Sequence, residues 1–242
     1  MLVAAAGTRF DIDGVVFDKD GTLISLDSYW LEPSRVWVDH AAGGDRDLRR
    51  TLASGLGLVL EAPASLVPDG LLASASLDDL VVHTRRVLER SGMTAAEAES
   101  RTTDARRRAS ELRSTLTPAS IGDVTGTVTA LAGAGLRLAV ATTDDAAPTY
   151  ETLEALEIAH HIEMVMAADG GGPTKPDPAV LTTIADRFGT RSDRLLMVGD
   201  SRRDAETARA AGAAGFVLVT REHTDRIPAD ATVSSIEEIR IL

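Results

Sequence analysis

Residues 14–23 read Gly-Val-Val-Phe-Asp-Lys-Asp-Gly-Thr-Leu, an apolar segment followed directly by charged residues and a glycine. Its first four residues form a short apolar run rich in valine, bounded by Asp13 and Asp18, which is the pattern of a buried strand. Two acids, Asp18 and Asp20, follow at the carboxyl end of this strand, and Gly21 permits a sharp turn after them. The motif predicts either a solvated Asp-Gly turn or a nucleophile, Asp18, with an acid/base partner, Asp20, around a metal ion.

Further apolar runs continue this pattern along the chain. Residues 136–141, 163–167, 195–198 and 216–219 predict four more buried strands, and apolar residues at helical spacing lie between them. Strands that alternate with helices of about 10–15 residues indicate a parallel sheet with helices on both faces. In such a sheet, ligands bind at the carboxyl ends of the strands. Residues 231–242 predict a short strand followed by a helix.

One long interval, residues 25–116, breaks the alternation. It shows no convincing strand and at least two helices, one of which is capped by Ser76 and another by Thr94. A helical block placed directly after the first strand predicts an inserted all-α cap domain. Residues 1–24 and 117–242 then form the core, an α/β domain with a doubly wound, mostly parallel, Rossmann-like sheet.

The composition excludes several classes of function. The chain has 242 residues and no cysteine, which rules out disulfides, thiolate metal sites and cysteine nucleophiles. With 25 basic and 37 acidic residues, its net charge of −12 disfavours a nucleic-acid partner. No apolar run approaches the ~20 residues that cross a membrane, and the first residues do not resemble a signal peptide. We therefore expect a cytoplasmic protein with no membrane partner.

Two more predicted strands end in polar residues. Thr142 and Thr143 follow the second strand, and their hydroxyls could donate to phosphate oxygens or simply cap the next helix. Asp200 and Asp204 follow the fourth strand, four positions apart, so both can face one side of a starting helix. Carboxylate oxygens suit Mg²⁺, although acids at the start of a helix are also favoured by the helix dipole alone.

Lysine is rare in this chain. Only two of the 25 basic residues are lysines, Lys19 in the first motif and Lys175 in the Gly- and Pro-rich loop 170–178. A lysine supplies a point charge for a phosphoryl group and for an attacking carboxylate, whereas a loop lysine more commonly faces solvent. The scarcity of lysine elsewhere favours a functional role for Lys175.

Four strand ends in chain order thus carry the groups that metal-assisted phosphoryl transfer needs. Together they resemble the haloacid dehalogenase (HAD) superfamily of phosphotransfer enzymes, in its phosphoglycolate-phosphatase-like branch with an inserted helical cap. The resemblance covers nearly the whole chain, but the cap contributes almost nothing to it. The motifs that carry it are Asp18-Lys19-Asp20-Gly21-Thr22, Thr142, Lys175-Pro176, and Gly199-Asp200-Ser201 with Asp204.

The resemblance implies a Mg²⁺-dependent phosphatase that hydrolyses a small phosphomonoester of the phosphoglycolate, sugar phosphate or nucleotide type. Asp18 would attack phosphorus and form an aspartyl-phosphate, while Asp20 would protonate the leaving alkoxide and then deprotonate water. Mg²⁺ would be held by the Asp18 carboxylate, the Asp20 backbone carbonyl and Asp200, with Asp204 orienting its waters.

The same resemblance assigns the phosphoryl oxygens to Thr142, Thr143 and Lys175. Dehalogenases of this superfamily lack the second carboxylate, and phosphonate-cleaving members use a cap lysine, which residues 25–116 do not contain. Two alternatives stay open: a sugar-phosphate mutase, and a non-catalytic HAD-fold binding subunit.

The expected partner is a small phosphorylated metabolite, and the sequence does not separate a monomer from a homodimer. Tyr29, Trp30 and Arg35 lie just after the first motif and could contact the leaving group. For aromatic residues the plainer alternative is packing inside the cap.

Overall fold

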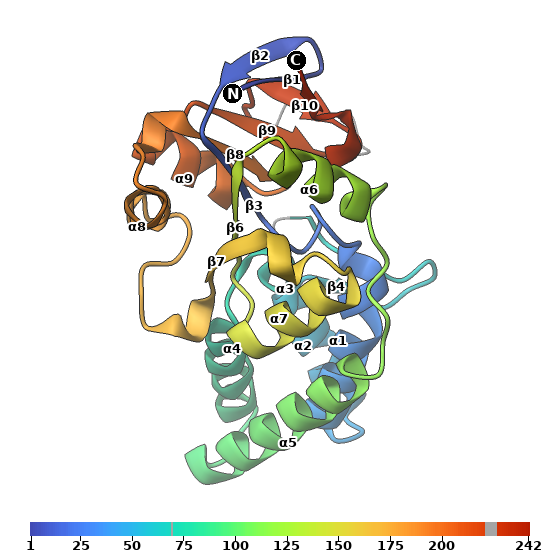
Figure 1. Ribbon diagram of the computed structural model, residues 1–242. Helices are drawn as coiled ribbons and strands as arrows, with labels where there is room; N and C mark the ends of the chain where they lie inside the picture. The colour runs from blue at the N-terminus through green and yellow to red at the C-terminus, as the bar shows by residue number, and fades with distance from the viewer. Residues whose placement is uncertain (69, 221–226) are drawn as a thin grey trace. The chain divides into compact units, whose positions relative to one another are not determined.

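The computed structural model describes residues 1–68, 70–220 and 227–242. Within these residues the chain forms two compact units, Met1–Ser25 with Pro118–Leu242 and, between them, Leu26–Thr117 (Figure 1). We call the first the core unit and the second the inserted unit. The assignment of these parts as catalytic core and cap stays a prediction, because compactness does not show what either part does.

The core unit is built on a six-stranded sheet in the order β10-β9-β8-β3-β6-β7, and every pairing in it is parallel. Its strands are β3 (Gly14–Phe17), β6 (Arg137–Ala141), β7 (Ile162–Met166), β8 (Leu195–Gly199), β9 (Gly215–Val219) and β10 (Ala231–Val233). The five strands expected from apolar runs are all present, and the predicted α/β class with a doubly wound parallel sheet is confirmed.

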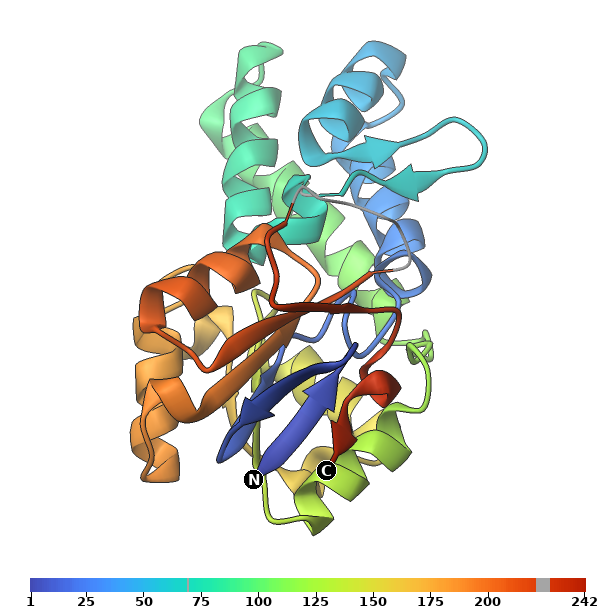
Figure 2. The same cartoon turned by 90° about the horizontal axis from the view of Figure 1, so that it is seen from above.

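Helices cover both faces of this sheet. In Figures 1 and 2, α8 (Ala179–Phe188) and α9 (Arg202–Ala211) lie on one face, and α6 (Val124–Gly133) and α7 (Ala146–Ala155) on the other. Because side chains alternate along a strand, Val16 faces α8 and α9 while its two neighbours face the opposite layer. The α8 and α9 face forms one buried cluster with Leu181, Ile184, Met197 and Leu218.

The two ends of the chain differ from the sequence expectation. The last residues form β11 (Arg240–Ile241) after a single turn of 3₁₀ helix, Ile236–Glu238, where a helix was predicted. β11 pairs with β1 (Leu2–Ala5), which also pairs with β2 (Thr8–Asp11), in a three-stranded antiparallel sheet. The helix prediction was wrong because the backbone groups of these residues are satisfied by a strand distant in sequence.

The inserted unit is helical, as predicted, but it is not all-α. Its helices are α1 (Leu26–Ala42), α2 (Arg46–Leu56), α3 (Leu71–Ser74), α4 (Leu77–Arg90) and α5 (Ala95–Arg113). The expected caps are confirmed, since the side chains of Ser76 and Thr94 each accept a bond from the backbone three residues later. A short antiparallel pair, β4 (Leu58–Val59) and β5 (Ser65–Leu66), was missed because two residues are too few to show strand alternation. Among the described residues, no helix is both long and apolar enough to cross a membrane.

Candidate active site

The central strands bring the predicted site residues together. β3 lies between β8 and β6, and Phe17 is in register with Val198 on one side and Val140 on the other. The three strands therefore end at the same edge of the sheet, where the direction of the strand order reverses and ligands bind in folds of this kind. Asp18, Thr142 and Asp200 are the residues that follow at this edge.

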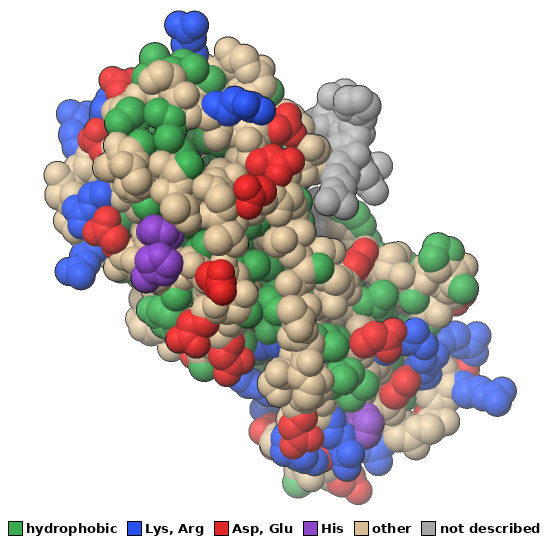
Figure 3. All heavy atoms as spheres, turned by 45° about the vertical axis from the view of Figure 1, so that its right-hand side comes forward, with side chains coloured by type: hydrophobic (Ala, Val, Ile, Leu, Met, Phe, Trp, Pro, Cys, Tyr) green, Lys and Arg blue, Asp and Glu red, His purple; other side chains and the backbone are tan. Residues whose placement is uncertain are grey.

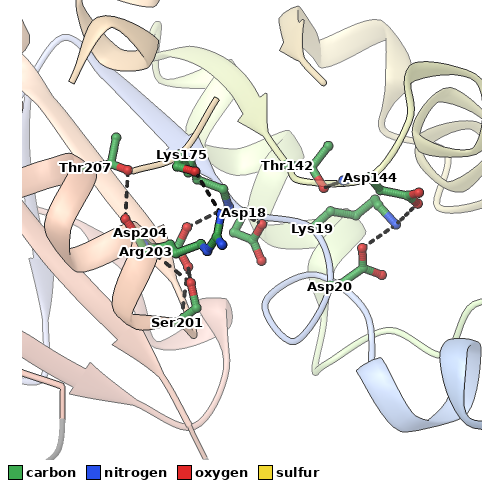
Figure 4. Close-up of polar contacts among 10 residues, drawn as sticks. All are labelled: Asp18, Lys19, Asp20, Thr142, Asp144, Lys175, Ser201, Arg203, Asp204 and Thr207. Atoms are coloured by element: carbon green, nitrogen blue, oxygen red, sulfur yellow. Dashed lines mark hydrogen bonds and ion pairs between the residues drawn. The ribbon is translucent and has the colours of Figure 1, made fainter. Parts of the chain in front are cut away.

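A buried lysine bridges two carboxylates at this edge (Figure 4). The ammonium of Lys175 donates to Asp18 Oδ1 at 2.5 Å and to Asp204 Oδ1 at 2.6 Å. Burial acts to lower the pKa of Lys175, but the charges of Asp18 and Asp204 outweigh it, so the pKa is raised and the lysine stays charged. The lysine predicted to lie in a functional loop is thus anchored inside the core unit, not in solvent.

A third carboxylate, Asp200, completes what we call the Lys175 cluster: Asp18, Lys175, Asp200 and Asp204. Oxygens of the three carboxylates lie within 4.8 Å of one another. Burial, and then the charge of Asp18, raise the pKa of Asp200 well above its usual value. Burial likewise raises the pKa of Asp18 to about 7, against the lowering effect of Lys175. Three ionised carboxylates and one lysine would leave a net charge of −2, which is the charge that a divalent cation offsets.

The backbone leaves room for this cluster at one glycine. Gly21 has φ +87°, a conformation that favours glycine, and a Cβ at this position would collide with the Asp200 carboxylate. Asp204 is held from the other side, because Ser201 donates its hydroxyl to Asp204 Oδ2 at 2.6 Å and its backbone N–H at 3.0 Å. The oxygen donors, their burial and their charge therefore fit a small hard cation such as Mg²⁺.

The second lysine forms a separate cluster beside the first. Lys19 is fully buried, and its ammonium lies 2.7 Å from Asp20 Oδ2 and 3.0 Å from Asp144 Oδ2 (Figure 4). We call Lys19, Asp20 and Asp144 the Lys19 cluster. The Asp144 backbone N–H donates to Thr142 Oγ1 at 3.1 Å, which ties the cluster to the end of β6. The carboxylate of Asp20 thus faces Lys19, and Thr143 follows Thr142 as a half-buried residue.

Comparison with known proteins supplies the family. Residues 12–212 match the model of the haloacid dehalogenase-like hydrolases. The chain belongs to this family. The resemblance inferred from the four motifs is confirmed, and most of the core unit and the whole inserted unit fall within the match.

Relatives of this hydrolase agree with the match. A phosphoglycolate phosphatase of Rhodospirillum rubrum is 32% identical over 213 residues, which cover 84% of this chain and 78% of the relative. A phosphoglycolate phosphatase of Escherichia coli K12 is 38% identical over 89 residues, but these cover only 37% of this chain and 35% of the relative. Family and relatives together support a phosphatase that acts on phosphoric monoesters.

A solved structure with the same fold extends the comparison to nearly the full length. A predicted phosphoglycolate phosphatase from Haemophilus somnus aligns with a TM-score of 0.68 and 20% identity, over 93% of this chain and 95% of that one. At this identity the similarity shows the fold alone.

Tyr29, Trp30 and Arg35, which could contact the leaving group, all make contacts within the inserted unit. Tyr29 and Trp30 are buried, and the guanidinium of Arg113 lies 4.2 Å from the centre of the Trp30 ring and 5.7 Å from that of Tyr29. Arg35 pairs with Glu32 at the surface at 3.2 Å. Packing inside the helical unit accounts for both aromatic rings, and a contact of any of the three predicted residues with substrate stays a prediction.

Sequence reasoning missed three charged residues that the structure places in these settings. Asp144 follows the Thr142 motif with no recognised role, yet it contacts Lys19. Arg203 donates to the backbone carbonyl of Lys175 at 3.3 Å, and Arg113 is the buried cation beside the aromatic rings. Only Arg203 had a local signal, since it lies between two residues of a recognised motif.

The arginine run 106–108 behaves as an ordinary solvated surface. Arg107 and Arg108 both pair with Asp104 on the same helix, and Arg106 pairs with Asp78. On the face shown in Figure 3, basic side chains are interspersed with acidic ones. Local pairing of this kind gives no reason to place a second phosphate or a carboxylate of the substrate there.

Proposed function

We propose that this HAD-family hydrolase is a Mg²⁺-dependent phosphatase that cleaves a small phosphomonoester through an aspartyl-phosphate on Asp18. The observation that carries the proposal is the Lys175 cluster, in which a buried carboxylate at the sheet edge lies 2.5 Å from a lysine and beside two more carboxylates. Two buried carboxylates and one half-buried carboxylate beside one lysine are costly for stability, and they are the groups that a metal-assisted nucleophilic displacement requires. Perturbed pKa values of this kind gather at functional sites.

The nucleophile and the metal share one carboxylate in this proposal. Asp18 and Asp200, with the backbone carbonyl of Asp20, would hold Mg²⁺, and Asp204 would orient its waters while it anchors Lys175. Mg²⁺ would supply positive charge that keeps the carboxylates ionised and neutralises the phosphoryl oxygens. Lys175 adds a fixed charge on the same side, because its ammonium already contacts the attacking residue.

The chemical steps then use two aspartates. An oxygen of Asp18 forms a bond to phosphorus as the bond between phosphorus and the leaving oxygen breaks. The leaving oxygen takes a proton from Asp20. Water next attacks the phosphorus of the aspartyl-phosphate and gives its proton to Asp20, which releases phosphate and restores both carboxyl groups. Thr142 accepts a bond from the backbone N–H of Asp144, so its own hydroxyl proton can go to a phosphoryl oxygen, with Thr143 beside it.

The relatives indicate which substrates to test first. Relatives described as phosphoglycolate phosphatases make 2-phosphoglycolate the first substrate to test, before sugar phosphates and nucleotides. We propose a cytoplasmic enzyme that acts on such a metabolite as a monomer or a homodimer. No described contact favours the mutase alternative, which we treat as one outcome of the substrate screen.

The test is phosphatase activity with and without metal. Wild-type protein is incubated with p-nitrophenyl phosphate in MgCl₂, in excess EDTA, and in EDTA followed by excess MgCl₂. We expect turnover in the first and third conditions only. A panel of 2-phosphoglycolate, sugar phosphates and nucleotides then ranks kcat/KM. Full activity in excess EDTA would overturn the metal assignment, and an isomerised sugar phosphate as the main product would overturn hydrolysis.

A second measurement tests the intermediate. Acid quenching during turnover of a ³²P-labelled substrate should leave label on the wild-type protein. Borohydride should then reduce the acyl phosphate at Asp18 to an alcohol and release the label. An Asp18→Asn variant is the matched control, since it preserves the size of the side chain and should carry no label. Label of equal amount on that variant would place the intermediate on another residue.

A further inference from the structure

Lys19 lies where a lysine is costly. Its side chain has no exposed surface, although lysines are almost never fully buried unless they are paired. Its ammonium contacts Asp20 from its own turn and Asp144 from the segment after β6. Burying a charge carries a desolvation cost, so the position needs an explanation beyond filling space.

The fold of the turn does not need a lysine side chain. The backbone carbonyl of Lys19 accepts bonds from Leu23 N–H at 2.9 Å and Ile24 N–H at 3.1 Å, and any residue would provide that carbonyl. Replacing a buried ion pair by apolar residues of similar volume is often neutral or stabilising. Stability therefore does not explain why this position and Asp144 are both charged.

The contacts of the Lys19 cluster form a continuous chain between two parts of the candidate site. Thr142 Oγ1 accepts from the backbone of Asp144, and Asp144 Oδ1 accepts from the backbone of Asp145 at 2.9 Å. Asp144 Oδ2 then contacts Lys19, which contacts Asp20 Oδ2. Asp144 is thus held by the backbone, and it can hold the lysine in turn.

We propose that Lys19 is a positioning residue that fixes the Asp20 carboxyl group for proton transfer, with Asp144 as the anchor of Lys19. The inference rests on the proposed phosphatase function and deepens it. An aspartate at the end of a turn has two rotatable bonds, and a contact at one oxygen fixes the direction of the other. A misplacement of about 1 Å in a reacting group can lower a rate by ~10²-fold.

If Lys19 has this role, its loss should affect substrates whose leaving group needs a proton more than substrates whose leaving group does not. The value of kcat/KM reports the steps up to release of the leaving group. An alkoxide leaves only when Asp20 supplies a proton, whereas p-nitrophenolate leaves with little protonation. Loss of the Lys19 contact should therefore damage alkyl ester cleavage more than aryl ester cleavage.

The experiment measures kcat/KM for glycerol 2-phosphate and p-nitrophenyl phosphate in saturating MgCl₂. We expect Lys19→Met to lower the alkyl value by ~10–10²-fold and the aryl value by much less. In an Asp20→Asn background, Lys19→Met should cause no further loss on the alkyl ester, because the group that it positions is already absent. Lys19→Arg, which keeps the charge, should recover part of the alkyl activity.

Asp144→Asn is the matched control, since it removes one charge from the same cluster and leaves the contact between Lys19 and Asp20. Its loss should be smaller than that of Lys19→Met but should have the same bias toward the alkyl ester, because Asp144 acts on Asp20 only through Lys19. Circular dichroism and thermal melts check folding. Should Lys19→Met not fold, the double variant with Asp144→Asn removes one charge of each sign and carries the same test.

Equal losses on both esters, or an undiminished loss in the Asp20→Asn background, would overturn the inference and leave Lys19 with a structural role only. These outcomes are distinct from failure of the proposed function, which would appear as wild-type protein that hydrolyses neither ester with Mg²⁺. That last result would overturn both proposals together.

Discussion

The core unit holds two buried lysines, and each contacts two carboxylates, but the two clusters differ in their charge balance. Lys175 contacts Asp18 and Asp204, with Asp200 beside them. Lys19 contacts Asp20 and Asp144. In the described part of the chain, no third carboxylate joins those two in a group of metal-binding size.

This difference in charge suits the two clusters to different roles, binding of a metal ion in the first and orientation of a neighbouring side chain in the second. Burial, together with the neighbouring carboxylates, raises the pKa values of Asp18 and Asp200 in the Lys175 cluster. When its three acids are ionised, this cluster has a net charge of −2, which a divalent cation offsets. The Lys19 cluster has a net charge of only −1 when both its acids are ionised, and its lysine contacts Asp20 and Asp144. We infer that the first cluster recruits metal and phosphate, whereas the second orients a proton donor.

The same amide substitution in each cluster gives the largest contrast. Asp18→Asn should lower kcat/KM by ~10⁴-fold or more because it removes the proposed nucleophile, with little change in thermal stability. Asp144→Asn should lower it by far less because Asp144 touches neither phosphorus nor leaving group. Steady-state kinetics with p-nitrophenyl phosphate checks both. Similar losses for the two variants would contradict the division between clusters.

The two lysines should differ in the pattern of their losses. Lys175→Met should lower kcat/KM by ~10²–10³-fold, as for removal of one group that stabilises transition-state charge. Because Lys175 contacts Asp18, the proposed nucleophile, the loss should be equal for aryl and alkyl phosphates. The measurement is the ratio of the aryl loss to the alkyl loss. A larger loss on alkyl esters would show that Lys175 also acts on the proton-transfer step assigned to Asp20.

Metal binding should depend on pH in the Lys175 cluster. The pKa of Asp18 rises from 3.8 to about 7, so the metal-free folded protein holds protons that the unfolded chain has released. Its stability should therefore fall as pH increases from about 4 to 7. Mg²⁺ binds the ionised carboxylates, so the increase in Tm that it causes should grow over the same range.

Thermal melts at pH 5, 6, 7 and 8, with and without MgCl₂, measure this effect. Asp200→Asn should reduce the increase in Tm at every pH, since it removes one charged ligand from the group of three. An increase of equal size at all four pH values, or one unchanged by Asp200→Asn, would argue against this cluster as the metal site.

The smallest expected effect concerns the support of Lys175. Arg203 donates to the backbone carbonyl of Lys175 at 3.3 Å, so Arg203→Ala should lower kcat by only a few fold, in line with ~1 kcal/mol for one hydrogen bond. Arg209→Ala, on the same helix, is the control and should leave kcat unchanged. A loss as large as that of Lys175→Met would show that Arg203 acts on substrate directly.

Local patterns in the sequence determined much of this protein. Apolar runs predicted strands β3, β6, β7, β8 and β9, and Ser76 and Thr94 marked two helix starts in the inserted unit. Motifs after the predicted strands identified the residues that the structure brings together in the Lys175 cluster. These features are predictable because strand alternation, caps and turns depend on residues close in the chain. The chemical roles of the cluster residues stay predictions.

Tertiary structure alone decided the rest. The chain end forms a strand because β1, more than 200 residues earlier, offers it a partner. Asp144 carried no signal of its own, and it acquires a place only because β6 lies beside β3 and brings it to Lys19. Burial raises the pKa of Asp18 and Asp200 only after three strand ends have met. Desolvation and the field of neighbouring charges depend on distances in space, and a sequence records those distances only where residues are neighbours in the chain.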